Sequence, residues 1–131
     1  SYRHSAMQDE GLVVLGATLE LARGDGEQIQ AAMDELQSRR ESKQPLDLGS
    51  AGSTFKRPEG HFAGKLIQDA GMRGHRCGGA QVSTKHAGFV VNASGATSSD
   101  VLHVIRDVQQ AVFETSGVRL EPEVRMWGFD A

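Results

Sequence analysis

Residues 49–66, GSAGSTFKRPEGHFAGKL, gather a serine hydroxyl, several cations and flexible glycines in one short stretch. A hydroxyl beside Lys and Arg can serve acid–base or nucleophilic chemistry, and glycines before a lysine can cradle a phosphate. The phosphate-binding loop motif needs four residues between its glycines and a Ser or Thr after the lysine. Only three residues separate Gly60 from Gly64, and Leu66 follows Lys65, so the stretch does not fit that motif.

Ser53 is the candidate reactive hydroxyl of this stretch. A nucleophilic serine needs a base beside it and commonly sits in a G-x-S-x-G turn, and neither feature surrounds Ser53. From the residues alone, a turn serine that bonds to its own backbone is the better interpretation. His75-Arg76-Cys77 offers two kinds of metal ligand, but no second pair follows at zinc-like spacing, and no metal site is predicted.

The composition predicts one soluble globular domain: 131 residues, 38% of them hydrophobic and 24% charged. The net charge of −3 and the lone Trp127 argue against nucleic-acid binding. Cys77 is the only cysteine, and the chain shows neither a signal peptide nor an apolar run of about 18 residues. We therefore expect a cytoplasmic protein that does not contact a membrane.

The first third of the chain predicts a strand and then a helix. Leu12–Leu21 is apolar and rich in strand-forming residues. Asp25 and Gln28 then form a helix N-terminal signal, and Pro45 ends that helix. Its apolar residues share one face: Ile29, Met33 and Leu36. The strand at residue 12 needs partners, and we expect them to precede the present chain.

The remaining elements indicate an α+β fold without a regular βαβ alternation. A possible short strand at 53–55 precedes a helix over 62–70 that ends at Gly71. GGAQVS and GFVVN predict two strands joined by TKHA, and a helix capped at Thr97 runs to Gly117. A final strand is expected over 118–127. The core face of the long helix comprises Leu102, Ile105, Val108 and Val112.

Five stretches, in order and across nearly the whole chain, resemble the UDP-N-acetylenolpyruvoylglucosamine reductases, flavoenzymes of bacterial cell-wall precursor synthesis. The stretches are YRHS at 2–5, KQPLDLGSAGSTFKRP at 43–58, HFAGKLIQDAGMRG at 61–74, GGAQVSTKHAGFVVN at 78–92 and LEPEVRMWG at 120–128. The resemblance covers only the C-terminal portion of that family. It implies that residues 1–22 are a remnant of the FAD-binding domain and that 23–131 form the substrate-binding domain, so we expect a fragment, inactive alone.

The family reaction, as the resemblance implies it, reduces an enolpyruvyl ether on a UDP-sugar to a lactyl ether. NADPH reduces FAD, the flavin passes hydride to the terminal carbon, and the carbon beside the carboxylate receives a proton. The implied partners are a UDP-sugar substrate and the missing N-terminal flavin domain. Neither FAD nor NADPH is expected to bind this fragment, because the glycine-rich pyrophosphate loop of the family is not found in it.

The resemblance also implies roles for individual residues. Ser53 matches the proton donor, and nearby Lys56 or Arg57 would favour its alkoxide. Glu123 matches a catalytic glutamate that stabilises the enolate, most easily as a protonated hydrogen-bond donor. Arg3 matches the arginine that pairs with the substrate carboxylate. Further substrate-binding candidates are Tyr2, which could donate a second bond there, Lys56, and the diphosphate candidates Lys43 and Arg57.

Several alternatives stay open at this point. Glu121 and Glu123 alternate onto the same face of a strand, so the sequence cannot separate a catalytic carboxylate from a surface one. Gln81, Ser83, Lys85 and His86 line the same cleft or merely shape it. A nucleotide-sugar binding module without catalysis would keep Lys43 and Arg57 but not require Ser53 or Glu123. An interaction domain that uses helix 100–116 is the third class.

Overall fold

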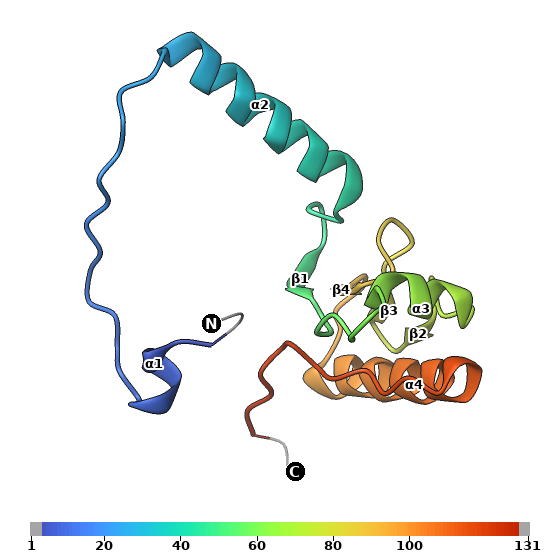
Figure 1. Ribbon diagram of the computed structural model, residues 1–131. Coiled ribbons are helices and arrows are strands. Elements are labelled where there is room, and N and C mark those ends of the chain that lie inside the picture. The colour runs from blue at the N-terminus through green and yellow to red at the C-terminus, as the bar shows by residue number, and fades with distance from the viewer. Residues whose placement is uncertain (1–3, 129–131) are drawn as a thin grey trace. The chain divides into compact units, whose positions relative to one another are not determined.

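The structure is a computed structural model that describes residues 4–128, and contacts divide the chain into two units, residues 1–34 and 35–131 (Figure 1). The boundary predicted between residues 22 and 23 concerns two evolutionary domains and stays a prediction. Among residues 4–128, no helix has the length and apolar character that crossing a membrane requires.

The first unit contains a short helix and an extended segment. Helix α1 spans Ala6–Asp9, and the backbone from residue 12 to residue 25 belongs to no helix or strand. The strand predicted at 12–21 is therefore wrong for the described residues. A strand is stable when its N–H and C=O groups find partners, and no described residue pairs with this segment. Val13 and Leu15 are accordingly 81% and 97% exposed.

Helix α2, Gly26–Lys43, begins and ends as predicted. An oxygen of Asp25 accepts a hydrogen bond from the Gln28 backbone N–H at 2.9 Å, which caps the first turn. Side-chain pairs four residues apart support the helix, including Gln30 with Asp34 and Gln37 with Glu41. The apolar residues of the predicted face are all at least half exposed: Ile29, Met33 and Leu36. Capping and side-chain pairs, rather than burial, account for this helix.

A four-stranded antiparallel sheet organises the second unit, in the order β1-β4-β3-β2. The strands are β1 Gly49–Ser53, β2 Arg76–Cys77, β3 Ala80–Val82 and β4 Phe89–Asn92. The predicted pair in GGAQVS and GFVVN is confirmed as β3 and β4. The possible strand at 53–55 lies earlier, as β1, because residues 49–53 rather than 53–55 pair with β4.

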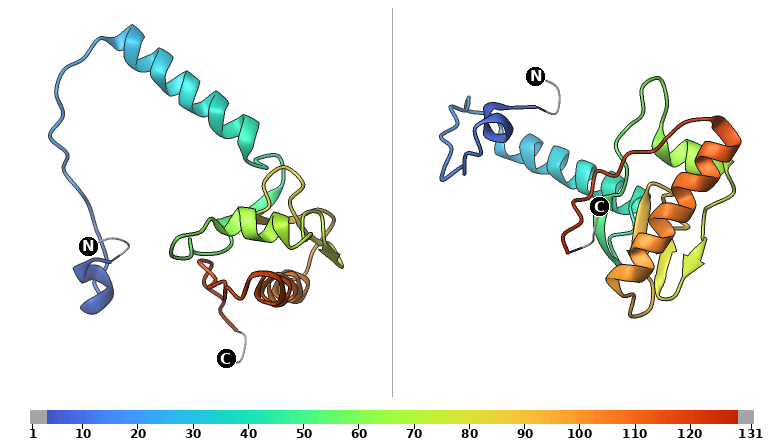
Figure 2. Two further views of the ribbon diagram at one scale, coloured as in Figure 1. Left: turned by 45° about the vertical axis from the view of Figure 1, so that its right-hand side comes forward. Right: turned by 90° about the horizontal axis from the view of Figure 1, so that it is seen from below.

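Helix α4, Ser98–Ser116, packs across the sheet, and helix α3, Ala63–Asp69, lies beside α4 (Figure 2). Both were predicted, including the stop at Gly117, whose φ of 71° favours glycine. Strand alternation points Val82 and Val90 into this core and Val91 to the other face, toward Pro45. The core comprises Phe55, Ile67, Ala80, Val82, Ala87, Val90, Val104, Ile105, Val108, Val112 and Leu120. The α+β class is confirmed.

The segment that follows α4 is not the predicted strand over 118–127. It contributes one isolated antiparallel bridge, Phe55 with Pro122. Backbone bonds from Lys56 to Glu121 and from Glu123 to Thr54 flank this bridge, so Pro122 stands at a position where no N–H is needed. The pairing does not become a regular ladder because the Thr54 N–H donates to the Gly88 carbonyl instead. The apolar pattern of residues 118–127 instead reflects anchoring: Leu120 is buried in the core, and Val124 packs against it.

A tight turn, Gly78-Gly79, joins β2 to β3 against the N-terminus of α4. The Asp100 carboxylate caps that helix by accepting the Thr97 backbone N–H at 2.9 Å, while Thr97 Oγ1 accepts the Asp100 N–H at 3.1 Å. The same carboxylate accepts the Gly79 N–H at 3.4 Å. A Cβ on Gly79 would lie 2.4 Å from the Ser94 carbonyl oxygen, so only glycine fits.

Replacing Gly79 with alanine is expected to destabilise this chain by about 1–3 kcal/mol or more, because backbone atoms must move to admit the methyl group. Urea unfolding of the Gly79→Ala variant measures the loss. Gly49→Ala is the matched control, since its Cβ would meet only the Asn92 Cβ at 3.9 Å. Equal stability of the two variants would contradict the tight turn.

Hydrogen bonds to Asp100 also predict a dependence on pH. Donation from the Thr97 and Gly79 backbones lowers the pKa of the Asp100 carboxyl below its usual value. Its contribution to stability is therefore present above the unfolded pKa of about 3.9 and is lost as pH falls through the lower folded pKa. In Asp100→Asn this dependence should disappear, so the stability gap to the parent chain should shrink below about pH 4. Unfolding curves between pH 7 and pH 3 test this, and a gap that is constant across the range would refute it.

Candidate functional site

Two segments far apart in the sequence pair directly beside the sheet. The Lys56 N–H donates to the Glu121 carbonyl at 2.8 Å, and the Glu123 N–H donates to the Thr54 carbonyl at 2.9 Å. These bonds flank the Phe55–Pro122 bridge. The pairing places Glu123 opposite Thr54, the residue that follows Ser53. The backbones that carry the predicted proton donor and the predicted enolate stabiliser are thus neighbours.

The 54–56 segment is fixed from its other side by β4. Thr54 is buried, its N–H donates to the Gly88 carbonyl at 2.9 Å, and its Oγ1 accepts the Val90 N–H at 3.0 Å. Phe55 is buried in the core. Because both residues are held inside, the polar residues on either side of them are set at defined places on the surface.

Ser53 ends β1 in a locally irregular register. The pairing with β4 shifts between Ser50 and Ser53, and Gly52 has a φ of 82°, which a side chain would strain. Ser53 then lies opposite Phe89 and is exposed. Glu123 is also exposed. That the two side chains approach the same substrate atoms stays a prediction.

The cations after Ser53 have partners that sequence reasoning did not find. Lys56 forms an ion pair with Glu121. Glu121 thus neutralises a lysine across the pairing. Arg57 donates from Nε to the His61 carbonyl at 3.2 Å, and its guanidinium lies 4.0 Å from the centre of the Phe62 ring.

Lys43 is not brought into this arrangement of described residues. Lys43 is exposed at the last position of α2, and among residues 4–128 its ammonium group forms no ion pair. Tyr2 and Arg3 lie outside the described residues. Their proposed contacts with the substrate carboxylate stay predictions.

The four residues left without roles lie in β3 and in the loop that follows it: Gln81, Ser83, Lys85 and His86. Ser83 Oγ accepts the N–H groups of Lys85 and His86, and Lys85 Nζ donates to the Glu41 carbonyl at 2.6 Å. His86 Nδ1 accepts the Gly88 N–H, and its ring meets Phe89 edge-on. Gln81, Ser83 and Lys85 line a hollow of about 430 Å³ there. These contacts explain the residues structurally.

No metal site is present among residues 4–128, where no three His, Cys, Asp or Glu side chains gather. His75, one of the ligand types noted in the sequence, lies 2.7 Å from an Asp107 oxygen instead. Cys77 is a free, half-buried cysteine.

The start of α4 does not fit the diphosphate of a flavin dinucleotide. A dinucleotide diphosphate needs backbone N–H groups, usually at a glycine-rich helix N-terminus. A mainly apolar hollow of about 500 Å³ does lie beside the start of α4, and it includes Leu102, Ile105 and Trp127. The Asp100 carboxylate already occupies that helix end, however, and would repel a phosphate.

Comparisons with known proteins agree on one family. Residues 44–127 match the family described as UDP-N-acetylenolpyruvoylglucosamine reductase, C-terminal domain. The chain is 58% identical to the reductase of that name from Clostridium beijerinckii, with 98% of this chain and 42% of the relative aligned. It is 59% identical to the Limosilactobacillus reuteri reductase, with 97% and 43% aligned. The chain thus spans well under half the length of these relatives.

A solved structure supports the same conclusion. The crystal structure of UDP-N-acetylenolpyruvylglucosamine reductase from Thermus caldophilus matches with a TM-score of 0.68 and 35% identity. The match covers 82% of this chain and 38% of the Thermus chain. The family match over residues 44–127 includes the 54–56 and 121–123 pairing, and the chain belongs to the UDP-N-acetylenolpyruvoylglucosamine reductase C-terminal domain family.

Proposed function

We propose that this chain supplies the substrate-binding and proton-donating part of a UDP-N-acetylenolpyruvoylglucosamine reductase. The whole enzyme would be a cytoplasmic oxidoreductase of bacterial peptidoglycan precursor synthesis that uses NADPH and FAD. The names and similarity of the relatives support the family reaction. The observation that carries the proposal is the backbone pairing that sets Glu123 opposite the residue after Ser53.

The division of labour follows from the length of chain that the relatives share. Since the chain aligns with about 42% of a relative, the flavin and NADPH are proposed to be held by the part that is not aligned. Residues 1–22 would belong to that flavin-binding part, and residues 23–131 would form the substrate-binding domain. The chain alone would then be inactive, and no step involving the flavin is derived from its residues.

Ser53 is proposed to complete the reduction of the enolpyruvyl group. Hydride addition leaves an electron pair on the carbon beside the carboxylate, and that pair takes the Ser53 hydroxyl proton. A C–H bond forms, the O–H bond breaks, and the alkoxide is reprotonated from water. A serine is a weak acid in water, but a carbanion-like centre is a strong base. The cations at residues 56 and 57 would favour the alkoxide.

The other candidates would hold the charge that develops on the substrate. Glu123, when protonated, would donate a hydrogen bond to the enolate, and Arg3 would pair bidentately with the substrate carboxylate beside Tyr2. Lys56 would bind substrate when released from Glu121, and Lys43 and Arg57 would bind the diphosphate. The cations among these candidates would match a substrate that carries a carboxylate and a diphosphate.

Ser53→Ala in the full-length reductase should leave NADPH oxidation by the flavin nearly unchanged and slow reduction of the enolpyruvyl substrate by roughly 10²–10⁴-fold. Only the second half-reaction needs the proton, so stopped-flow measurement of the two steps separates them. Ser99→Ala, an exposed serine on α4, is the matched control. Equal losses in both half-reactions would assign Ser53 a structural role, and no loss in either would show that Ser53 is not the proton donor.

Glu123→Gln in the same protein should slow enolpyruvyl reduction by about 10²–10³-fold, the cost typical of losing one donor to a developing oxyanion. The first half-reaction should again remain near the parent rate. Glu114→Gln, which removes an exposed carboxylate from α4, should change neither step. A Glu123→Gln variant that turns over at the parent rate would remove Glu123 from the catalytic set.

A further inference from the structure

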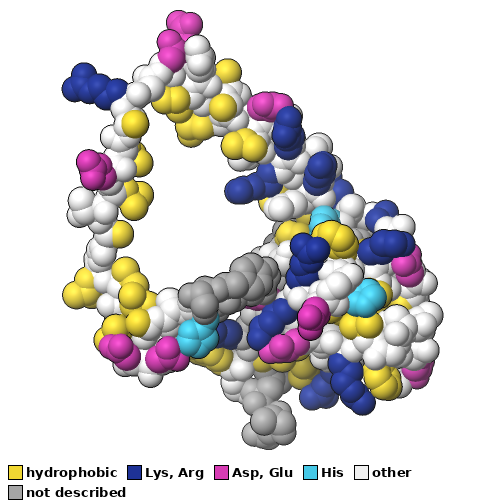
Figure 3. Space-filling view, viewed as in Figure 1, with side chains coloured by type: hydrophobic (Ala, Val, Ile, Leu, Met, Phe, Trp, Pro, Cys, Tyr) yellow, Lys and Arg dark blue, Asp and Glu magenta, His cyan; other side chains and the backbone are white. Residues whose placement is uncertain are grey.

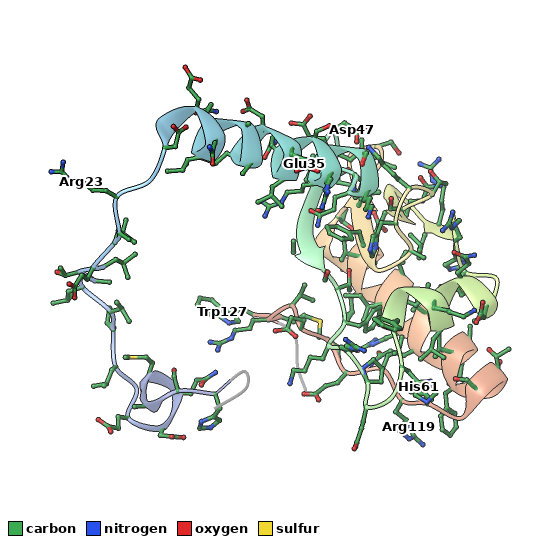
Figure 4. All side chains as sticks on the ribbon, turned by 45° about the horizontal axis from the view of Figure 1, so that its top comes forward. Arg23, Glu35, Asp47, His61, Arg119 and Trp127 are labelled. Atoms are coloured by element: carbon green, nitrogen blue, oxygen red, sulfur yellow. The ribbon has the colours of Figure 1, made fainter. Side chains whose placement is uncertain are left out.

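A hollow of about 440 Å³ lies where the paired segments continue past the Phe55–Pro122 bridge. His61 and Arg119 line it together, from opposite sides of the pairing (Figure 4). Its lining comprises Lys56, Arg57, Pro58, Glu59, His61, Val118, Arg119 and Glu121. Two arginines, one from each segment, therefore face one hollow.

Aromatic rings hold both guanidinium groups in place. The Arg57 group lies 4.0 Å from the centre of the Phe62 ring, and the Arg119 group lies 4.2 Å from the centre of the Phe113 ring. Arg57 uses only Nε, on the His61 carbonyl. Among residues 4–128, Arg119 donates no side-chain hydrogen bond in the structure. The terminal N–H groups of both guanidinium groups are thus available to a ligand. Because the rings already hold the side chains, binding costs little further side-chain entropy.

The charge balance of the hollow favours a small polyanion. Lys56 and Glu121 neutralise each other, which leaves two arginines against the carboxylate of Glu59. Arg119 also borders a second hollow, of about 650 Å³, which includes Arg106. On the face seen in Figure 3, Lys and Arg side chains are interspersed with Asp and Glu rather than gathered in one broad patch. The positive charge is therefore local, on the scale of a phosphate group rather than of a nucleic acid.

We propose that Arg119 is a diphosphate-binding residue and that it clamps, opposite Arg57, the diphosphate of a nucleotide sugar. Paired guanidinium forks match phosphate oxygens bidentately. The identity of the ligand rests on the proposed function, in which one sugar ring carries both the diphosphate and the enolpyruvyl group. The hollow suits that substrate because it lies close to the proposed catalytic pair. Lys56 lines the hollow, and it is two residues of extended chain, about 7 Å, from Thr54, which lies opposite Glu123.

The test is nuclear magnetic resonance titration of the present chain with four probes: UDP-N-acetylglucosamine, UDP, N-acetylglucosamine and NADP⁺. The parent chain should bind the first two with similar Kd and N-acetylglucosamine far more weakly. Arg119→Gln and Arg57→Gln should each weaken UDP binding roughly tenfold to hundredfold. Arg119→Lys should fall between Arg119→Gln and the parent, since it keeps the charge and loses the fork. Arg73→Gln, an exposed arginine that donates to Gln68, is the matched control and should change Kd less than twofold.

Several outcomes would overturn the assignment. One is a Kd for UDP that is the same in Arg119→Gln as in Arg73→Gln. Another is that the folded parent chain binds none of the probes. A third is that N-acetylglucosamine binds as tightly as UDP. If NADP⁺ binds more tightly than UDP, and Arg119→Gln weakens that binding, the hollow is a dinucleotide site instead. The two proposals can fail independently. If Ser53→Ala leaves enolpyruvyl reduction intact, the proposed proton donor is wrong. If Arg119→Gln nevertheless weakens UDP binding, the diphosphate site stands.

Discussion

The arrangement of the candidate site depends on two backbone hydrogen bonds, from Lys56 to Glu121 and from Glu123 to Thr54. They join a segment in the middle of the chain to one that follows the last helix. Without them, Ser53 and Glu123 would be separated by 69 intervening residues with nothing to set their spacing. The same bonds bring Arg57 and Arg119 to one hollow. One short pairing thus serves both the proposed proton transfer and the proposed anion clamp.

The sheet and α4 make this pairing possible by anchoring each segment separately. Thr54 is bonded to Val90 on β4 and to Gly88 just before it, so the first segment is an extension of the sheet edge. Leu120 is buried, and the Gln109 side-chain amide donates to its carbonyl at 2.8 Å, so the second segment is tied to α4. The polar residues between these anchors face solvent. Core packing therefore fixes the backbones and leaves the candidate chemical groups exposed to substrate.

The sequence predicted those elements whose signals are local. Thr97 with Asp100 and Asp25 with Gln28 are caps that work within one helical turn, and both helices begin where those caps stand. The strands over 80–82 and 89–92 were found because both carry apolar runs. Three segments were predicted wrongly or only in part: β1, residues 12–25 and residues 118–127. Whether such segments form strands depends on pairing partners far away in the sequence, and the strand propensity of their own residues does not reveal those partners. Alternation therefore misled over residues 118–127, where pairing is limited to one bridge because the Thr54 N–H is already bonded to Gly88.

The candidate site shows the same division. Ser53 and Glu123 became candidates because a family resemblance covers their motifs, whereas the ion pair of Glu121 with Lys56 was seen only in the fold. Arg119 has no local signal that sets it apart from any surface arginine. Arg119 becomes a candidate only because Phe113 lies beneath it and Arg57 lies across the hollow, and both contacts arise from the tertiary structure.

The irregular register at Gly52 also limits self-association in concentrated solution. β1 is an edge strand of small, uncharged residues, with β4 on one side. A flat edge of that kind is a template on which a strand from another molecule can add. The shift between Ser50 and Ser53 interrupts the outward row of N–H and C=O groups and increases the local twist. An incoming strand therefore finds no continuous ladder, and the glycine that presents Ser53 also blunts the edge of the sheet.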